Sequence, residues 1–133
     1  MRLHHVQVAC PRGGEDGARR FYADGLGMVE VEKPAELRGR GGAWFRAAAP
    51  AGALASGGAE VHVGVEEPFR PARKAHPAFV LDDVAALESV AARLEGLGFT
   101  VDWAERTTYA GHERFHTRDA HGNRVEVLAV AAG

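Results

Sequence analysis

Residues 122–127, GNRVEV, repeat the pattern of residues 58–63, GAEVHV, and this repetition decides the fold. In both segments valine alternates with small or polar residues, which is the period-two pattern of a β-strand with one buried face. His62 and Glu126 occupy the same place in the two segments, 64 positions apart, and both are able to bind a metal. Internal repetition of this kind indicates a duplicated structural unit.

The beginning of each half repeats as well. HVQVA at 5–9 corresponds to HPAFV at 76–80, and the tripeptide GLG at 25–27 recurs at 96–98, both with an offset of 71. The offset falls to 64 at the far end, so the first half is longer by 71 − 64 = 7 residues. We expect this extra length in the stretch AAAPAGALASGG at 47–58, which its small residues predict to be a loop.

Each half is predicted to be a βαβββ module in a single α+β domain that spans residues 1–133. Module 1 covers about 1–66, a linker with two prolines and three basic residues covers about 67–75, and module 2 covers about 76–130. A stripe of apolar residues at intervals of three and four predicts a helix in module 2, capped by Asp82 or Asp83. The predicted strands are 3–10, 28–32, 43–47, 60–66, 76–81, 99–103, 112–117 and 123–130, and the first helix is 15–24.

Composition restricts the classes of function. The net charge is −2 and the basic residues are scattered among acidic ones, which argues against a nucleic-acid partner. No apolar run approaches the roughly 20 residues that span a bilayer, and no signal peptide is expected. The single cysteine, Cys10, cannot form an internal disulfide and is expected to be buried and inert; a reducing cytoplasm is the expected location.

The repeated positions His5, His62, His76 and Glu126 are the candidate metal ligands. Strand alternation places His5 on the face opposite Val6, so the ligand face and the helix-packing face are separate. If the ligand faces line one concave surface, nitrogen and oxygen donors converge there in the way that divalent zinc, nickel, iron, manganese or cobalt require. A lone strand histidine is usually structural, so it is the joint register of the four residues that favours a metal site.

Four motifs of the chain are characteristic: His5-Val6, Phe21-Tyr22 with Gly25-Leu26-Gly27, His76-Pro77-Ala78-Phe79 with Asp82, and Asp119-Ala120-His121-Gly122-Asn123-Arg124-Val125-Glu126. With these motifs the chain resembles the vicinal oxygen chelate superfamily, which includes glyoxalase I, extradiol dioxygenases and the bleomycin and fosfomycin resistance proteins. The resemblance covers about residues 3–130. It implies paired βαβββ modules whose largely antiparallel mixed sheet curls into a cup around a metal, with helices on the outer face, commonly in a homodimer. It places the metal ligands on the first and last strands of each module.

The function that the resemblance implies is a metal-dependent isomerase or lyase of glyoxalase type, acting on a small carbonyl or dicarbonyl-derived substrate through an enediolate on the metal. Glu126 is the first candidate for proton transfer and Glu60 the second. The predicted substrate contacts are His116, Arg46 and Trp44, while His121 is expected in an exposed turn.

Two alternatives stay open. Glyoxalase I-like enzymes usually carry a carboxylate or amide at both module ends, whereas this chain has His62 at the first. The chain could therefore be a metal-free protein that sequesters a drug or metabolite. It could also be an iron-dependent extradiol dioxygenase, since those enzymes use two histidines and one glutamate.

Overall fold

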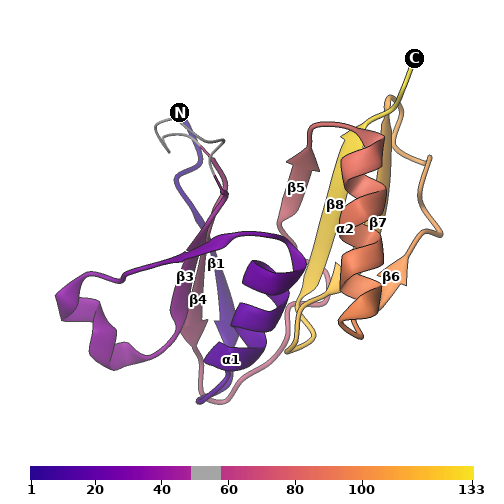
Figure 1. Ribbon diagram of the computed structural model, residues 1–133. Coiled ribbons are helices and arrows are strands. Elements are labelled where there is room, and N and C mark those ends of the chain that lie inside the picture. Colours follow the sequence, from indigo (N-terminus) through magenta and orange to yellow (C-terminus); the bar gives the residue numbers. More distant parts are fainter. Residues whose placement is uncertain (49–57) are drawn as a thin grey trace. The chain divides into compact units, whose positions relative to one another are not determined.

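A computed structural model describes residues 1–48 and 58–133, in which the chain forms two compact units, Met1–Pro71 and Ala72–Gly133 (Figure 1). The boundary falls inside the predicted linker. Each unit holds a four-stranded mixed sheet and helical segments in the order βαβββ, so the predicted α+β fold with two such modules is confirmed. Most of the loop predicted at 47–58 lies outside the described residues.

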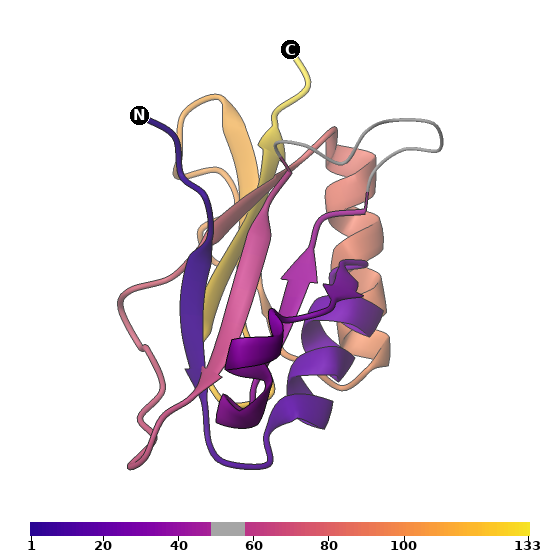
Figure 2. The same ribbon diagram turned by 90° about the vertical axis from the view of Figure 1, so that its left-hand side faces the viewer.

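The first unit is a sheet in the order β1-β4-β3-β2, in which β1 pairs with β4 in parallel and the other pairs are antiparallel. Figure 2 shows β1, in indigo, running beside β4. The elements are β1 (Val6–Cys10), α1 (Glu15–Ala18), η1 (Arg19–Gly25), β2 (Val29–Val31), η2 (Ala35–Arg40), β3 (Ala43–Arg46) and β4 (Glu60–Val65).

The helix predicted at 15–24 begins as one α-helical turn and continues as a π-helical segment, η1. It ends at Gly25, and the chain turns away at Gly27, whose φ of 77° is the left-handed conformation that glycine adopts without steric cost. Phe21 and Tyr22 are fully buried on its inner side, and the Tyr22 ring stacks on Phe45 of β3 with centroids 5.6 Å apart. The apolar residues of the alternating strands therefore pack on this helix, as the sequence predicts.

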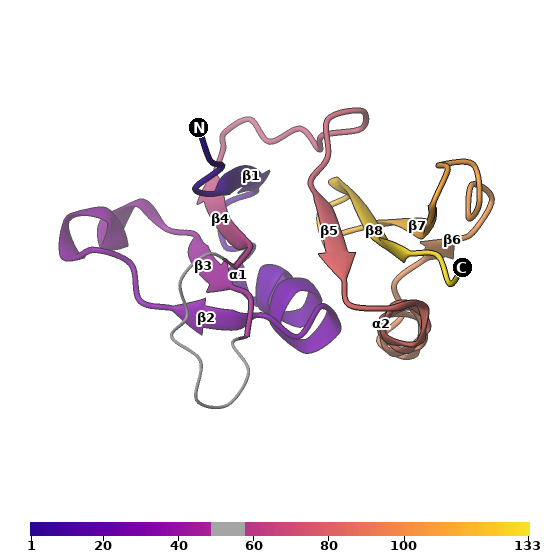
Figure 3. The same ribbon diagram turned by 90° about the horizontal axis from the view of Figure 1, so that it is seen from above.

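The second unit repeats this plan, with the sheet order β5-β8-β7-β6 and a parallel β5–β8 pair. Figure 3 shows α2 nearly end-on against one face of this sheet. Leu87, Val90, Ala91 and Leu94 are its buried stripe. The elements are β5 (Ala78–Leu81), α2 (Val84–Gly96), β6 (Val101–Asp102), β7 (His112–Arg118) and β8 (Arg124–Val130).

Both ends of α2 have clear physical causes. The Asp83 carboxylate accepts a hydrogen bond from the Ala86 amide at 2.7 Å, so Asp83 is the N-cap. At the other end Gly98 takes a φ of 89°, and the Phe99 amide donates to the Leu94 carbonyl at 2.9 Å. This is the Schellman arrangement that glycine permits.

The strand register confirms the repeat read from the sequence. Gln7 lies opposite His62 in the β1–β4 pair, and Ala78 lies opposite Glu126 in the β5–β8 pair. The two pairs are related by offsets of 71 and 64, the same values that the motifs give. His62 and Glu126 are therefore structural equivalents in the two units.

Several boundaries differ from the sequence prediction. His5 and His76 precede β1 and β5 rather than lying within them, and β6 is only two residues long. The η2 helix was not predicted, because its residues carry no apolar repeat. In the part of the chain that the structure describes, no helix is long and apolar enough to cross a membrane.

Candidate metal site

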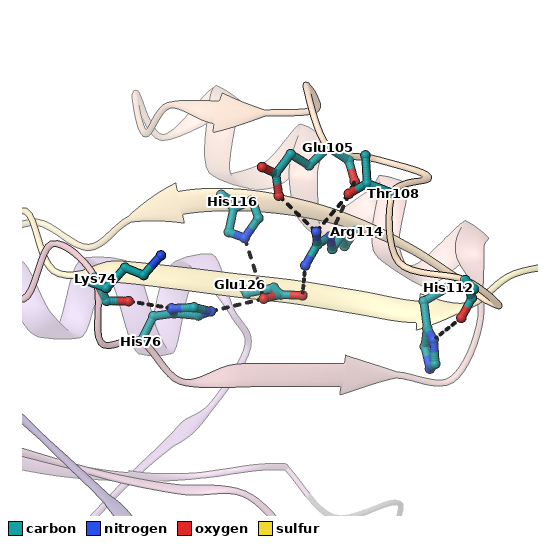
Figure 4. Close-up of polar contacts among 9 residues, drawn as sticks. Lys74, His76, Glu105, Thr108, His112, Arg114, His116 and Glu126 are labelled. Atoms are coloured by element: carbon teal, nitrogen blue, oxygen red, sulfur yellow. Dashed lines mark hydrogen bonds and ion pairs between the residues drawn. The ribbon is translucent and has the colours of Figure 1, made fainter.

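Glu126 lies at the centre of a polar cluster on the second sheet (Figure 4). It sits on β8 between two neighbouring strands, with Ala78 of β5 on one side and His116 of β7 directly opposite on the other. Its neighbours Val125 and Val127 are buried on the other face of the strand. Alternation along β8 therefore sends the carboxylate away from the apolar face and toward the histidines.

His76 reaches the cluster from the segment just before β5. Its Nδ1 lies 2.8 Å from the Lys74 carbonyl oxygen, which can only accept, so Nδ1 carries the proton. Nε2 points instead at Glu126 Oε2, 3.1 Å away. A proton on Nε2 makes this contact a hydrogen bond to the carboxylate, and a cation bound by both atoms would lie in the same place. A histidine that donates one N–H to a backbone carbonyl is the usual arrangement around a bound metal.

Two of the three donor separations are close to those found around a metal ion. His76 Nε2 and His116 Nε2 lie 3.1 and 3.5 Å from Glu126 Oε2, and the ligand atoms of the three residues lie within 4.8 Å of one another. Two donors that each lie about 2.1 Å from one metal are about 3.0 to 3.4 Å apart, in octahedral or tetrahedral geometry. Within residues 1–48 and 58–133, these three residues form the group of histidine, cysteine or carboxylate side chains whose ligand atoms lie close enough together to hold a metal ion.

Arg114 holds the other oxygen of the Glu126 carboxylate. Its Nη1 donates to Glu126 Oε1 at 3.2 Å, while its Nη2 donates to Glu105 Oε2 and to Thr108 Oγ1, both at 2.8 Å. The guanidinium carbon also lies 5.8 Å from the centre of the Tyr109 ring. Arg114 is thus anchored by the segment before β7, and it fixes Glu126 with Oε2 facing the histidines.

The electrostatics keep the cluster in the protonation states that a metal needs. Burial raises the pKa of Glu126, but hydrogen bonds from His76 and Arg114 outweigh it and leave this pKa below the ordinary value. Burial lowers the pKa of His116, and the charge of Arg124 lowers it further. At neutral pH the cluster therefore offers an ionised carboxylate and an uncharged His116 imidazole.

The segment before Glu126 has a structural role. Asn123 is 1% exposed, and its side chain accepts from the Ala72 amide at 2.9 Å and donates to Asp119 Oδ2 at 2.9 Å. Asp119 Oδ1 accepts from the amides of His121 and Asn123. These bonds close the β7–β8 turn and bind it to the start of the second unit. His121 lies in this turn, as predicted, and is half-buried rather than exposed.

The equivalent positions of the first unit hold an aromatic stack. His5 packs on His62 with centroids 4.0 Å apart, and Trp44, which lies opposite His62 on β3, packs on it at 3.7 Å with planes 1° apart. Glu60 Oε1 lies 2.8 Å from His62 Nε2, and Arg46 donates to Glu60 Oε2 at 3.1 Å. Glu60 and His62 thus share a strand face, as the alternation predicts.

The His62–Glu60 pair is an uncharged imidazole that donates to a carboxylate. Burial lowers the pKa of His62 more than Glu60 raises it. The hydrogen bond from His62 lowers the pKa of Glu60, as does the bond from Arg46. In this arrangement His62 Nε2 faces Glu60.

The predicted site residues are thus divided between the two units. His76 and Glu126 are brought together in the second unit, and His5 and His62 are brought together in the first. Arg46 and Trp44 contact Glu60 and His62 respectively. His116, predicted as a substrate contact, also belongs with His76 and Glu126 to the group of side chains that could hold a metal ion, which we call the metal-compatible group. The turn at 119–123 pairs Arg118 with Arg124, and counting back two residues along each strand pairs His116 with Glu126. The length of this turn was therefore the sequence signal that could have identified His116 as a neighbour of Glu126.

The structural class of the chain is defined by its duplicated βαβββ module, with two histidines and a glutamate gathered on the second sheet as a candidate metal site. The sequence profile described as the Glyoxalase/Bleomycin resistance protein/Dioxygenase superfamily matches residues 2–127, and the chain belongs to this family.

Solved structures agree with this assignment. A protein from Bacillus anthracis described as belonging to the glyoxalase family is 37% identical, with a TM-score of 0.81 over 98% of this chain and 95% of that one. The fosfomycin resistance protein FosX from Listeria monocytogenes has the same fold at 12% identity, with a TM-score of 0.72 over 97% and 93% of the two chains. A domain from Frankia sp. EAN1pec, described as glyoxylase/bleomycin resistance protein/dioxygenase, is 19% identical with a TM-score of 0.68 over 100% and 94%. Among curated proteins nothing matches the chain.

Proposed function

We propose that this protein is a metal-dependent isomerase or lyase of glyoxalase type, which acts on a small carbonyl or dicarbonyl-derived substrate. The observation that carries the proposal is the convergence of His76 Nε2, His116 Nε2 and Glu126 Oε2 at distances suited to a shared cation. Membership of the family and the 37% identity to a protein described as glyoxalase family give further support.

The residues of the second unit would hold a divalent ion, which in such sites polarises a carbonyl oxygen and acidifies the neighbouring C–H. His76 is oriented for this by the Lys74 carbonyl, and Glu126 is oriented by Arg114. Three protein ligands leave positions for substrate oxygens or water. We assign proton transfer first to Glu126, which stays ionised because its pKa is low, and second to Glu60.

Other sequence predictions are kept as proposals. His5 and His62 remain candidate ligands because of the repeat, and Trp44 and Arg46 remain candidate substrate contacts. A homodimer and a cytoplasmic location also remain proposals. His116 remains a candidate substrate contact and is now proposed as a metal ligand as well.

A second candidate is an iron-dependent extradiol dioxygenase. The composition of the cluster supports it, since two histidines and one carboxylate with open positions are the ligand set of non-haem Fe(II) oxygenases. A FosX mutant from Listeria monocytogenes has been solved with Mn(II) and 1S,2S-dihydroxypropylphosphonic acid. Mn²⁺ therefore belongs beside Ni²⁺, Zn²⁺ and Fe²⁺ among the ions to be tested.

The first test is metal affinity in chelator-treated protein, measured by calorimetric titration with Mn²⁺, Ni²⁺, Zn²⁺ and anaerobic Fe²⁺. We expect one bound ion per chain, and H116A and E126Q should each weaken binding by more than about tenfold. H112A is the matched control, because His112 lies on the same strand β7 but outside the cluster, stacked on Tyr109. H5A and H62A determine whether those residues also bind the ion.

Activity separates the candidate functions. The loaded protein should catalyse exchange of the C–H beside a carbonyl with deuterated solvent, which NMR detects in hemithioacetals formed from methylglyoxal and a thiol. Oxygen uptake with catechols in the iron-loaded protein favours the dioxygenase. If wild-type protein binds none of the four ions, the metal site is refuted, and a metal-free binding protein becomes the better-supported function.

A further inference from the structure

We infer that the first unit has its own binding site for a small organic anion, in a hollow beside Trp44. The hollow has a volume of about 190 Å³ and lies between β1, β3, β4 and the η2 segment. This is below the size of an ordinary drug-binding pocket, so it suits a small molecule or one end of a larger one. The inference does not depend on a metal, because the lining residues belong to the first unit alone.

The charge of the hollow selects an anion. Lys33 and Arg40 both line it, and no aspartate or glutamate is among the described residues that do. The Lys33 ammonium donates to the Gly41 carbonyl, which holds it at the wall and leaves its other N–H donors available. The Arg40 side chain makes no ion pair or hydrogen bond to any residue in 1–48 or 58–133. Its planar guanidinium can therefore bind a carboxylate or phosphonate with two N–H groups.

Three acidic residues of this unit have hydrogen-bond or ion-pair partners of their own. Glu15 accepts a hydrogen bond from the Gly42 amide at 2.8 Å. Glu32 pairs with Arg38 at 2.6 Å, and Glu30 accepts from Arg19 at 2.8 and 3.0 Å. These three carboxylates therefore have partners other than Lys33 and Arg40, which are the charged residues among those that line the hollow.

The rest of the lining suits an apolar body with a polar edge. Leu37, Val63 and Val65 provide apolar surface, and Trp44 provides an aromatic wall whose ring also packs on His62. The side-chain amide of Gln7 makes no hydrogen bond within the described residues. It lies over Gly64, and its Nε2 is only 2.2 Å from the position that a Cβ on residue 64 would take. A side chain at position 64 would displace it, so the glycine keeps this donor and acceptor over the sheet. The geometry therefore points to a small carboxylate or phosphonate with an apolar or aromatic body.

The test uses chelator-treated W103F protein, in which Trp44 is the remaining tryptophan and reports occupancy by fluorescence. Benzoate and phenylphosphonate are the anionic probes, and benzamide is the neutral analogue of similar shape. We expect the anions to bind with a Kd of about 1 mM, as suits so few atoms, and benzamide to bind about tenfold more weakly. Added NaCl should weaken the anions and leave benzamide unaffected.

Arg40 and Arg38 give a matched pair of variants. Both lie on η2 and lose one positive charge on change to glutamine, but only Arg40 lines the hollow. R40Q should weaken benzoate binding about fivefold, whereas R38Q should change it less than twofold. Three results would each overturn the inference. Benzoate and benzamide could bind equally well, R40Q and R38Q could have equal effects, or neither anion could bind up to about 10 mM. Since no metal is present, these outcomes are independent of the proposed reaction.

Discussion

Replacing Asn123 by alanine should destabilise the second unit by about 3 kcal/mol. The side chain is 1% exposed and makes hydrogen bonds of 2.9 Å to the Ala72 amide and to Asp119 Oδ2. A neutral hydrogen bond contributes about 1 kcal/mol and one to a charged group about 1.5 to 3 kcal/mol, and a buried group that loses its partner adds a desolvation penalty. The φ angle of Asn123 is negative, so alanine introduces no backbone strain.

The loss is measured by urea unfolding in a W44F background, where Trp103 reports the second unit through its contact with Phe115. R118A is the control, because exposed Arg118 donates to the Gly122 carbonyl in the same turn at 3.2 Å. It should cost less than about 0.5 kcal/mol. If N123A also lies within about 0.5 kcal/mol of the parent, the buried amide does not hold the turn and the reasoning is wrong.

Two further predictions concern the first unit. The hydrogen bond from the Gly42 amide lowers the pKa of Glu15 below its ordinary 4.5, so the carboxylate stabilises the fold above that pH and this stability is lost as pH falls through the folded-state pKa. E15Q should therefore lose less stability than wild type between about pH 6 and pH 3 in urea unfolding, and parallel losses would contradict this. Gly42 has a φ of 84° and its Cβ would lie 2.1 Å from the Val63 carbonyl oxygen, whereas Gly98 has a φ of 89° and open space. G98A should cost about 1 to 2 kcal/mol in thermal unfolding and G42A clearly more; equal costs would mean that β4 can shift.

The fold could be predicted because it depends on local pattern and repetition. Strand alternation predicted that Val61 and Val63 of β4 are buried, and the apolar stripe located α2. Asp82 and Asp83 were the two predicted N-caps, and the structure selects Asp83. The offsets of 71 and 64 reappear as the paired residues of the two parallel strand pairs. None of these inferences requires knowledge of contacts between distant segments.

The parts that were missed depend on such contacts. His116 joins the metal-compatible group because the turn at 119–123 sets the β7–β8 register, which alternation alone does not determine. Asn123 was read as part of a family signature, and its bond to Ala72 joins residues 51 positions apart. The η2 segment has no periodic apolar pattern, so the sequence predicts neither this helix nor the hollow beside it.

Equivalent backbone positions in the two units carry different chemistry, and two substituted positions explain the difference: His62 in place of Glu126, and Trp44 in place of His116. A carboxylate at position 126 extends between two strands and reaches His76 Nε2 at 3.1 Å, while His116 lies opposite at 3.5 Å. An imidazole at the equivalent position 62 instead presents flat faces, on which His5 and Trp44 stack at 4.0 and 3.7 Å.

In the first unit the carboxylate nearest to this position belongs to Glu60, which lies two residues before His62. Glu60 accepts a hydrogen bond from His62. The repeat therefore predicts where side chains stand, whereas the identity of the residue decides whether they converge on a cation or pack as rings. For this reason the metal proposal rests on the second unit, and the anion site, which uses the aromatic wall of Trp44, rests on the first.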